Sequence, residues 1–218
     1  TMPAPRRAQL LKWAMAAPDR WIIEDDYDSE FRFDIRPLPS LQGMAGEDGP
    51  VIYLTTFSKS LAPSIRMAAM VLPRPLLGRW QAMYGSYSST VSRYEQETLG
   101  RFIRDGHFTR HLARLRSQYK QRMETLAAAL EAAFPGRVEL QGRHTGLHLL
   151  LTLKNGPGEA AMVARARAAG VRLEGLRGYY LARPEHCPEN TVVVGYAALP
   201  PGDIPALAEA LRAAWQKP

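Results

Sequence analysis

The chain has 218 residues, of which 46% are hydrophobic and 22% charged, a composition typical of a folded globular protein. Its formal net charge of +7 is compatible with nucleic-acid binding, but much of the excess lies in residues 101–122, where the apolar periodicity predicts a helix with a charged solvent face. The single cysteine, Cys187, excludes an internal disulfide framework, and no apolar run approaches the roughly 18 residues of a membrane span. Without a signal-peptide pattern, we expect a soluble cytoplasmic protein.

Residues 1–90 are predicted to form an α/β region. A helix of about three turns within residues 1–20 ends at Pro18, and a strand follows over 21–27. A loop rich in proline and glycine covers 28–49. Further elements are expected as strands over 51–57 and 67–72 and a helix over 76–84.

Residues 91–218 are predicted to form a long helix and a small α/β domain. Apolar residues recur at spacings of three and four from Phe108 to Phe134, and Pro135 and Gly136 close this amphipathic helix. A shorter helix precedes it over 95–104. The small domain is expected to contain strands over 138–140, 146–153, 171–173 and 191–196 and helices over 158–169 and 201–215.

The most informative stretch is residues 51–66, VIYLTTFSKSLAPSIR. Its apolar strand ends in a cluster of hydroxyls around Lys59, and Arg66 follows seven residues later. In an open α/β sheet, ligands bind outside the carboxyl ends of the strands. A lysine can form a Schiff base with an aldehyde, while the hydroxyls of Thr56 and Ser58 and a guanidinium can hold phosphate oxygens. The alternatives are a surface lysine and hydroxyls that satisfy backbone groups in a tight turn.

A second stretch, WIIEDDYDSEF over residues 21–31, becomes acidic at its carboxyl end. Side chains two apart on a strand share a face, so Asp25 and Tyr27 are expected to point the same way and Asp26 the opposite way. A carboxylate for the ring nitrogen, a phenol for the ring oxygen and a lysine for the aldehyde together suit pyridoxal phosphate. Asp26 is predicted to be a structural hydrogen-bond acceptor.

Several ordered motifs resemble the aminotransferase-like domain of MocR-type regulators in the GntR superfamily: IIEDDYDSEFRFD, the SLQ of PLPSLQ, TFSKSLAPSIR and MVLP. The resemblance implies an α/β PLP-dependent transferase fold of type I, with the C-terminal part of the large cofactor-binding domain in residues 1–90 and a small domain in 91–218. It also implies a homodimer in the intact protein. It further implies a preceding portion of the large domain and an N-terminal winged helix-turn-helix that binds DNA, and neither of these two parts is expected within residues 1–218. We therefore expect a fragment of a longer protein.

Two functions remain open under this resemblance. In the first, an amine or amino-acid effector displaces Lys59 from the cofactor and so controls transcription. In the second, the protein is a free class I or II aminotransferase. A third alternative is that the cofactor site is incomplete in a fragment. Enzymes of this fold place a carboxylate-binding arginine in the last strand, where this chain has Val192, Val193 and Val194. Arg177 is the nearest substitute or else a solvated loop arginine.

The pair His107 and His111 lies four residues apart on a predicted helix. Two helical histidines without a third ligand are insufficient for a metal site, so no metal is expected.

Overall fold

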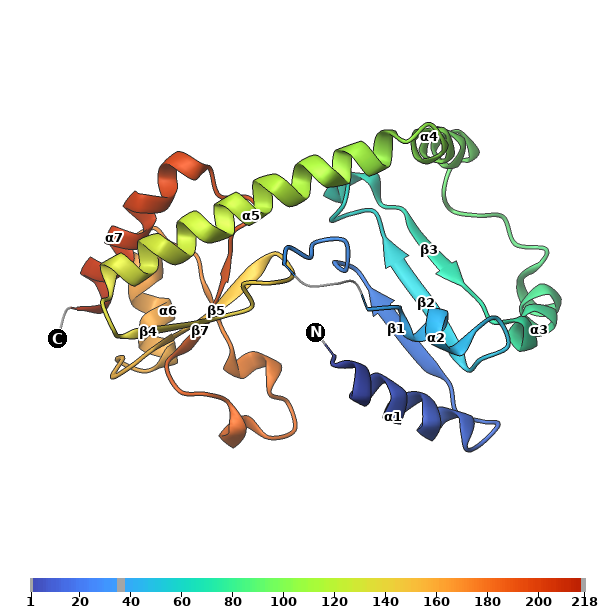
Figure 1. Ribbon diagram of the computed structural model, residues 1–218, viewed down its shortest axis with the longest axis horizontal. Helices are drawn as coiled ribbons and strands as arrows, with labels where there is room; N and C mark the ends of the chain where they lie inside the picture. Colours follow the sequence, from blue (N-terminus) through green and yellow to red (C-terminus); the bar gives the residue numbers. More distant parts are fainter. Residues whose placement is uncertain (1, 35–37, 217–218) are drawn as a thin grey trace. The chain divides into compact units, whose positions relative to one another are not determined.

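The computed structural model describes residues 2–34 and 38–216 (Figure 1). The chain divides into two compact units, residues 1–113 and 114–218, and the division falls within the long helix α5 (His107–Ala133). The predicted boundary near residue 90 stays a prediction. None of the helices in the described part of the chain combines the length and apolar character that a transmembrane span requires.

The first unit contains a three-stranded sheet with strand order β1-β2-β3. Strand β1 (Ile22–Asp26) runs parallel to β2 (Val51–Thr56), and β2 runs antiparallel to β3 (Ala68–Val71). The helices of this unit, besides the start of α5, are α1 (Ala4–Met15), α2 (Leu41–Ala45), α3 (Arg74–Tyr84) and α4 (Arg93–Arg104). The predicted elements of this region are therefore present, with ends shifted by a few residues.

The two faces of this sheet differ in burial. Ile22 and Val51, which are paired across β1 and β2, lie in an apolar cluster with Leu11 and Ala14 of α1 and Leu41 of α2. On the opposite face Ile23 is 66% exposed. Because side chains alternate along a strand, helices α1 and α2 cover one face while the other face stays open.

Helix α2 was not predicted, because it lies within the stretch expected to be a loop. The Ser40 hydroxyl accepts a hydrogen bond from Gly43 N at 2.9 Å and caps the helix start. The Glu24 carboxylate of β1 accepts from Leu41 N at 2.8 Å and from Gln42 N at 3.1 Å. A short five-residue helix is thus held by a carboxylate 17 residues earlier in the sequence, which local pattern does not reveal.

The second unit contains a four-stranded antiparallel sheet with strand order β4-β5-β7-β6. Its strands are β4 (Val138–Gln141), β5 (His148–Leu153), β6 (Glu174–Gly175) and β7 (Thr191–Gly195), and its helices besides α5 are α6 (Glu159–Ala168) and α7 (Ile204–Trp215). Its core combines buried residues of all these helices with the inward faces of β5 and β7. They include Leu126, Leu130, Phe134, Leu149, Leu151, Leu153, Met162, Val192, Val194, Ile204 and Leu211.

The predicted strand over residues 171–173 is wrong. Val171 N donates to Ala166 O at 2.9 Å, so its amide completes the end of α6 instead of a sheet ladder. The strand that does form is β6, in which Glu174 pairs with Val193 and Gly175 with Val192. The strand therefore begins a few residues later in the sequence than predicted.

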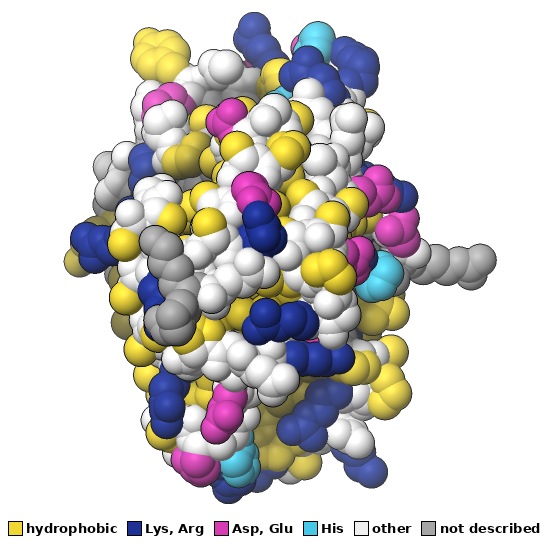
Figure 2. Space-filling view, turned by 90° about the vertical axis from the view of Figure 1, so that its left-hand side faces the viewer, with side chains coloured by type: hydrophobic (Ala, Val, Ile, Leu, Met, Phe, Trp, Pro, Cys, Tyr) yellow, Lys and Arg dark blue, Asp and Glu magenta, His cyan; other side chains and the backbone are white. Residues whose placement is uncertain are grey.

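Lysine and arginine side chains are dispersed over the face shown in Figure 2, with hydrophobic and acidic side chains between them. The stretch 101–122 lies on α4 and the start of α5, as its periodicity predicts. Arg101 and Arg104 of α4 both pair with Glu97. Part of the basic excess is thus neutralised along a solvated helix face.

Candidate functional site

The carboxyl ends of β1 and β2 lie side by side because these strands are parallel. Asp25 is paired with Leu54, so the next residues on the same face are Tyr27 and Thr56. Burial along β1 alternates, and Ile23, Asp25 and Tyr27 are all exposed. A carboxylate, a phenol and a hydroxyl thus occupy the open face of the sheet at the edge where the two strands end.

The Tyr27 phenol is adjacent to two carboxylates. The negative charge of Asp28, partial burial and the negative charge of Asp25 together raise the pKa of Tyr27 above its usual value. The phenol therefore keeps its proton at neutral pH. It can donate a hydrogen bond to an oxygen of a bound ligand.

Asp26 points to the other face and is engaged in the fold. Its Oδ2 accepts from the Tyr53 hydroxyl at 2.9 Å and from Ser29 Oγ at 2.7 Å, and its Oδ1 accepts from Ser29 N at 3.2 Å. Burial, followed by the hydrogen bond and the charge of Asp26, raises the pKa of Tyr53 to about 12. The prediction that Asp26 is a structural acceptor is confirmed.

The segment after β2 forms a closed loop. Phe57 N donates to Met67 O at 3.1 Å, which joins the two ends of the loop. Lys59 and Arg66 both lie on it and both are exposed. Arg66 adopts a left-handed conformation with φ 49°, directly after a short 3-10 turn over Pro63–Ile65. The loop therefore presents an ammonium and a guanidinium to solvent within one compact segment.

The hydroxyls of Thr56, at the end of β2, and Ser58 lie next to each other. Thr56 Oγ1 is 3.1 Å from Ser58 Oγ and 3.3 Å from Met67 O, and it accepts from Ser58 N at 3.2 Å. The Thr56 hydroxyl satisfies backbone groups in a tight turn, which was the alternative to phosphate binding, whereas the Ser58 hydroxyl contacts the Thr56 hydroxyl. A hydroxyl has one donor and two acceptor positions, so these bonds do not prevent Thr56 and Ser58 from contacting a phosphate. Phosphate binding by these two residues stays a prediction.

The start of α5 supports the lysine loop, which the sequence did not indicate. His111 Nε2 lies 3.0 Å from the carbonyl oxygen of Ser60, the residue after Lys59. The Phe57 and Phe108 rings make an edge-to-face contact with centroids 5.9 Å apart. His111 thus contacts the loop backbone. Across residues 2–34 and 38–216, no group of three or more His, Cys, Asp or Glu residues is arranged to hold a metal ion.

Arg177 and Cys187 belong to the second unit. Arg177 begins a 3-10 turn, is exposed, and its backbone N donates to Glu159 Oε2 at 2.9 Å. Its predicted role toward a substrate carboxylate stays a prediction. Burial and the charge of Glu159 raise the pKa of the Cys187 thiol, an effect that Arg177 partly opposes. This environment disfavours the thiolate and therefore a nucleophilic role.

The residues at the ends of β1 and β2 fit pyridoxal phosphate chemically. The loop of residues 57–67 offers a primary amine, hydroxyls and a guanidinium, which suit an aldehyde and a phosphate. The strand beside it offers Asp25 and the protonated phenol of Tyr27. The roles of Lys59 and its neighbours in binding are still predictions, because the fit rests on the types of group present.

Comparison with known proteins decides the family. The model of the family "Aminotransferase class I and II" matches residues 17–211. The chain belongs to this family. The predicted family and the type I transferase fold are thereby confirmed.

The relatives include both regulators and enzymes. The chain is 39% identical over 99% of its length to the uncharacterized HTH-type transcriptional regulator YdeL of Bacillus subtilis, of which it covers 45%. It is 30% identical over 90% of its length to the probable rhizopine catabolism regulatory protein MocR of Rhizobium meliloti, of which it covers 39%. The chain therefore spans about half the length, or less, of the curated relatives it matches, and the predicted resemblance to MocR-type regulators is confirmed.

A solved relative shows the fold with a bound ligand. The α-aminoadipate aminotransferase LysN of Thermus thermophilus is 29% identical, with a TM-score of 0.79 over 97% of this chain and 54% of LysN. That structure is a complex with N-(5'-phosphopyridoxyl)-L-leucine. A pyridoxyl group joined to an amino acid in a relative agrees with the predicted cofactor.

Proposed function

We propose that this chain is the pyridoxal phosphate-binding, effector-sensing part of a bacterial transcriptional regulator. The observation that carries the proposal is the 39% identity to an HTH-type regulator over 99% of the chain. The similarity to the probable regulatory protein MocR also supports it. The last strand, β7, supports it as well, because it contains Thr191, three valines and Gly195 and no arginine. A sensor has less need of the fixed carboxylate clamp that an aminotransferase uses for repeated turnover.

The proposed roles follow from the chemistry of each group. Lys59 Nζ holds the cofactor covalently, and Arg66 with the hydroxyls of Thr56 and Ser58 binds its phosphate. Asp25 pairs with the ring nitrogen and Tyr27 donates to the ring oxygen. When bound, the cofactor supplies an aldehyde carbon that either a lysine or an effector amine can occupy.

Displacement of Lys59 by an effector amine provides a signal within the first unit. Release of the side chain removes the covalent link between the cofactor and a loop whose backbone contacts α5 through Ser60 and His111. We propose that this change is passed to a winged helix-turn-helix that precedes the domain in the full-length protein. We also propose that the full-length protein is a cytoplasmic homodimer. A ligand shifts such an equilibrium only through its different affinity for the two states.

Borohydride reduction tests the proposal. The full-length protein and this chain are incubated with pyridoxal phosphate, their absorption spectra are recorded, and the reduced samples are mapped by peptide mass. We expect the adduct on Lys59 and none in Lys59→Ala, with Lys154→Ala as a matched control because Lys154 is an exposed lysine of the other unit. An adduct spread over several lysines would contradict the assignment of Lys59.

The second candidate is a free class I or II aminotransferase, favoured by the similarity to LysN. There Lys59 would also move a proton between substrate and cofactor carbon atoms. Repeated conversion of an amino donor and a keto acceptor by the full-length protein would establish this function. Spectral response to an amine without turnover, together with effector-dependent DNA binding, would establish the sensor instead.

A further inference from the structure

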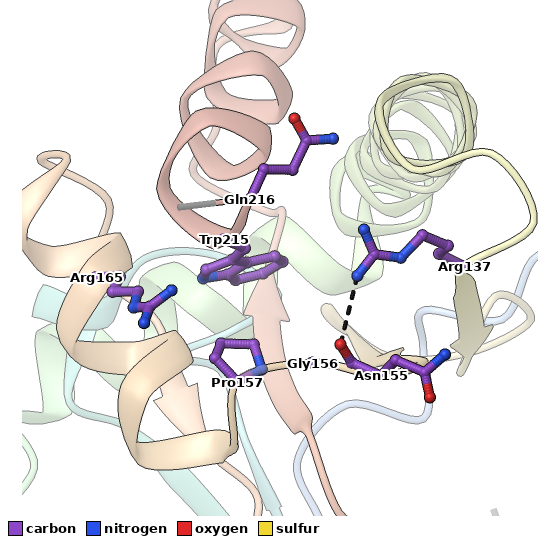
Figure 3. Close-up of a pocket in the computed structure, with 7 residues that line it drawn as sticks. All are labelled: Arg137, Asn155, Gly156, Pro157, Arg165, Trp215 and Gln216. Atoms are coloured by element: carbon purple, nitrogen blue, oxygen red, sulfur yellow. Dashed lines mark hydrogen bonds between the residues drawn. The ribbon is translucent and has the colours of Figure 1, made fainter. Parts of the chain in front are cut away.

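A pocket of about 550 Å³ lies in the second unit, and its lining residues are Arg137, Asn155, Gly156, Pro157, Arg165, Trp215 and Gln216 (Figure 3). Arg137 donates to Asn155 O at 3.4 Å, which Figure 3 marks as a dashed line. The indole N of Trp215 donates to Met162 O at 3.0 Å. These two side chains are already bonded within the fold, and the pocket gives no evidence for a ligand.

The turn that carries Lys59 is closed on itself. Leu61 N donates to Phe57 O at 2.9 Å, so residues 57–61 form a single backbone turn with Lys59 at its centre. Lys59 is exposed, whereas Ser60, the next residue, is only 1% exposed. The turn therefore leaves the lysine accessible while it buries the residue that follows.

Helix α5 contacts this turn on both sides of Lys59. After the lysine, His111 Nε2 lies 3.0 Å from the carbonyl oxygen of Ser60. Before the lysine, the Phe57 ring meets the Phe108 ring edge to face, with centroids 5.9 Å apart. Residues three apart are neighbours on a helix surface, so Phe108 and His111 belong to one face of α5. One helix face thus holds the turn at two points.

The contact between His111 and Ser60 has a defined donor. A carbonyl oxygen can only accept a hydrogen bond, so His111 Nε2 carries the shared hydrogen. Because Ser60 is buried, loss of this donor would leave a desolvated carbonyl oxygen with one partner fewer, which is costly. The bond therefore favours one conformation of the turn.

The ring of Phe102, in α4, supports both contacting side chains of α5. Its centroid lies 6.5 Å from that of the Phe108 ring and 6.5 Å from that of the His111 ring, in edge-to-face geometry. It also stacks on the His107 ring at 5.7 Å. Packing of this kind restricts the rotamers of a supporting side chain and thereby fixes the group that it holds.

We propose that His111 is a positioning residue for Lys59. It acts through the backbone of Ser60, holds the turn in one conformation and so limits the directions that the lysine side chain can take. An amine that is already oriented reacts with an aldehyde faster than one that must first be ordered. This inference rests on the proposed covalent role of Lys59.

Substitutions in the full-length protein separate positioning from general support of the fold. His111→Phe removes the donor but keeps a ring beside Phe102. His111→Gln keeps an N–H donor at a similar distance from the backbone, whereas His111→Asn places its amide one carbon closer to the helix. His107→Phe is the matched control, because His107 lies one turn earlier on α5 and its Nδ1 contacts Arg110 at 3.0 Å.

Hydrogen exchange without cofactor measures the order of the turn. The reporting amides are those of Phe57, which donates to Met67 O, and Leu61, while the amides of β5 in the second unit serve as the reference for global unfolding. His111→Phe and His111→Asn are expected to accelerate exchange of the two turn amides about three- to tenfold, the effect of one lost hydrogen bond. His111→Gln and His107→Phe are expected to change it by less than about twofold.

The rate at which the Lys59 adduct forms measures positioning itself. Each protein is mixed with pyridoxal phosphate, reduced with borohydride at fixed times and mapped by peptide mass. The rate is expected to fall about three- to tenfold in His111→Phe and His111→Asn and to recover in His111→Gln. A purely structural role would lower the unfolding temperature without changing this rate in the folded protein.

Two results would overturn the proposal. The first is equal exchange of the turn amides in His111→Phe and His107→Phe. The second is an adduct rate in His111→Phe equal to that of the unsubstituted protein. If His111→Phe does not fold, the comparison of His111→Gln with His111→Asn decides, and equal behaviour of that pair overturns the proposal.

The two proposals fail separately. Absence of a Lys59 adduct in the unsubstituted protein contradicts the proposed function. The exchange of the turn amides is measured without cofactor, so it still shows whether His111 holds the turn.

Discussion

Replacement of Glu24 by glutamine is expected to destabilise the first unit by about 3 kcal/mol. Glu24 and Arg7 have side chains that are only 12% and 11% exposed, with Arg7 Nη1 3.4 Å from Glu24 Oε1. The same carboxylate accepts from Leu41 N and Gln42 N. Hydrogen bonds to a charged group contribute about 1.5–3 kcal/mol each, and loss of one member of a buried ion pair costs about 3–5 kcal/mol. Because an amide keeps one acceptor, the lower end of that range applies.

Urea unfolding followed by tryptophan fluorescence measures this loss, because three of the four tryptophans lie in the first unit: Trp13, Trp21 and Trp80. Hydrogen exchange of the α2 amides supplies a local readout, and Glu24→Gln is expected to accelerate it. The matched control is Glu47→Gln, whose ion pair with Arg74 is 67% and 64% exposed. Its cost is expected to stay below about 0.5 kcal/mol. Equal costs for the two substitutions would refute the claim that Glu24 anchors α2 to β1.

Three further outcomes are expected. Tyr53→Phe should remove one tyrosine that ionises near pH 12 in an absorbance titration. The pKa of Tyr53 in the folded protein lies above the unfolded value of about 10, so the contribution of this residue to the free energy of unfolding is complete below pH 10 and is lost as the pH rises through 12. The variant should lack this pH-dependent decrease in stability. Asp25→Asn should raise the Kd for pyridoxal phosphate about tenfold or more with little change in stability, whereas Asp26→Asn should mainly lower stability, by about 1–2 kcal/mol in urea unfolding; the reverse pattern would contradict the assignment of the two faces. Tyr196→Phe should destabilise the second unit by about 1–3 kcal/mol, because the buried Tyr196 hydroxyl donates to Gly146 O at 2.6 Å, and an unchanged thermal unfolding curve would count against this bond.

The local elements could be predicted from the sequence wherever one pattern extended over many residues. The spacing of apolar residues from Phe108 to Phe134 predicted α5, which spans His107–Ala133. The alternation along β1 predicted that Asp25 and Tyr27 share a face and that Asp26 does not. These features follow from the periods of helices and strands, which depend on neighbouring residues alone. The motif around Lys59 also predicted the family that the comparisons confirm.

Features that depend on partners distant in the sequence were decided by the tertiary structure. Helix α2 exists where a loop was expected, because the Glu24 carboxylate meets its first amides. The strand expected over 171–173 gave way to β6, because Val171 N bonds to the end of α6. The support of the lysine loop by His111 joins positions 51 residues apart. The pocket around Trp215 collects residues from positions 137 to 216. No local pattern specifies such contacts, since they form only when separate elements pack together and their free energy comes from burial and charge at the points where they meet.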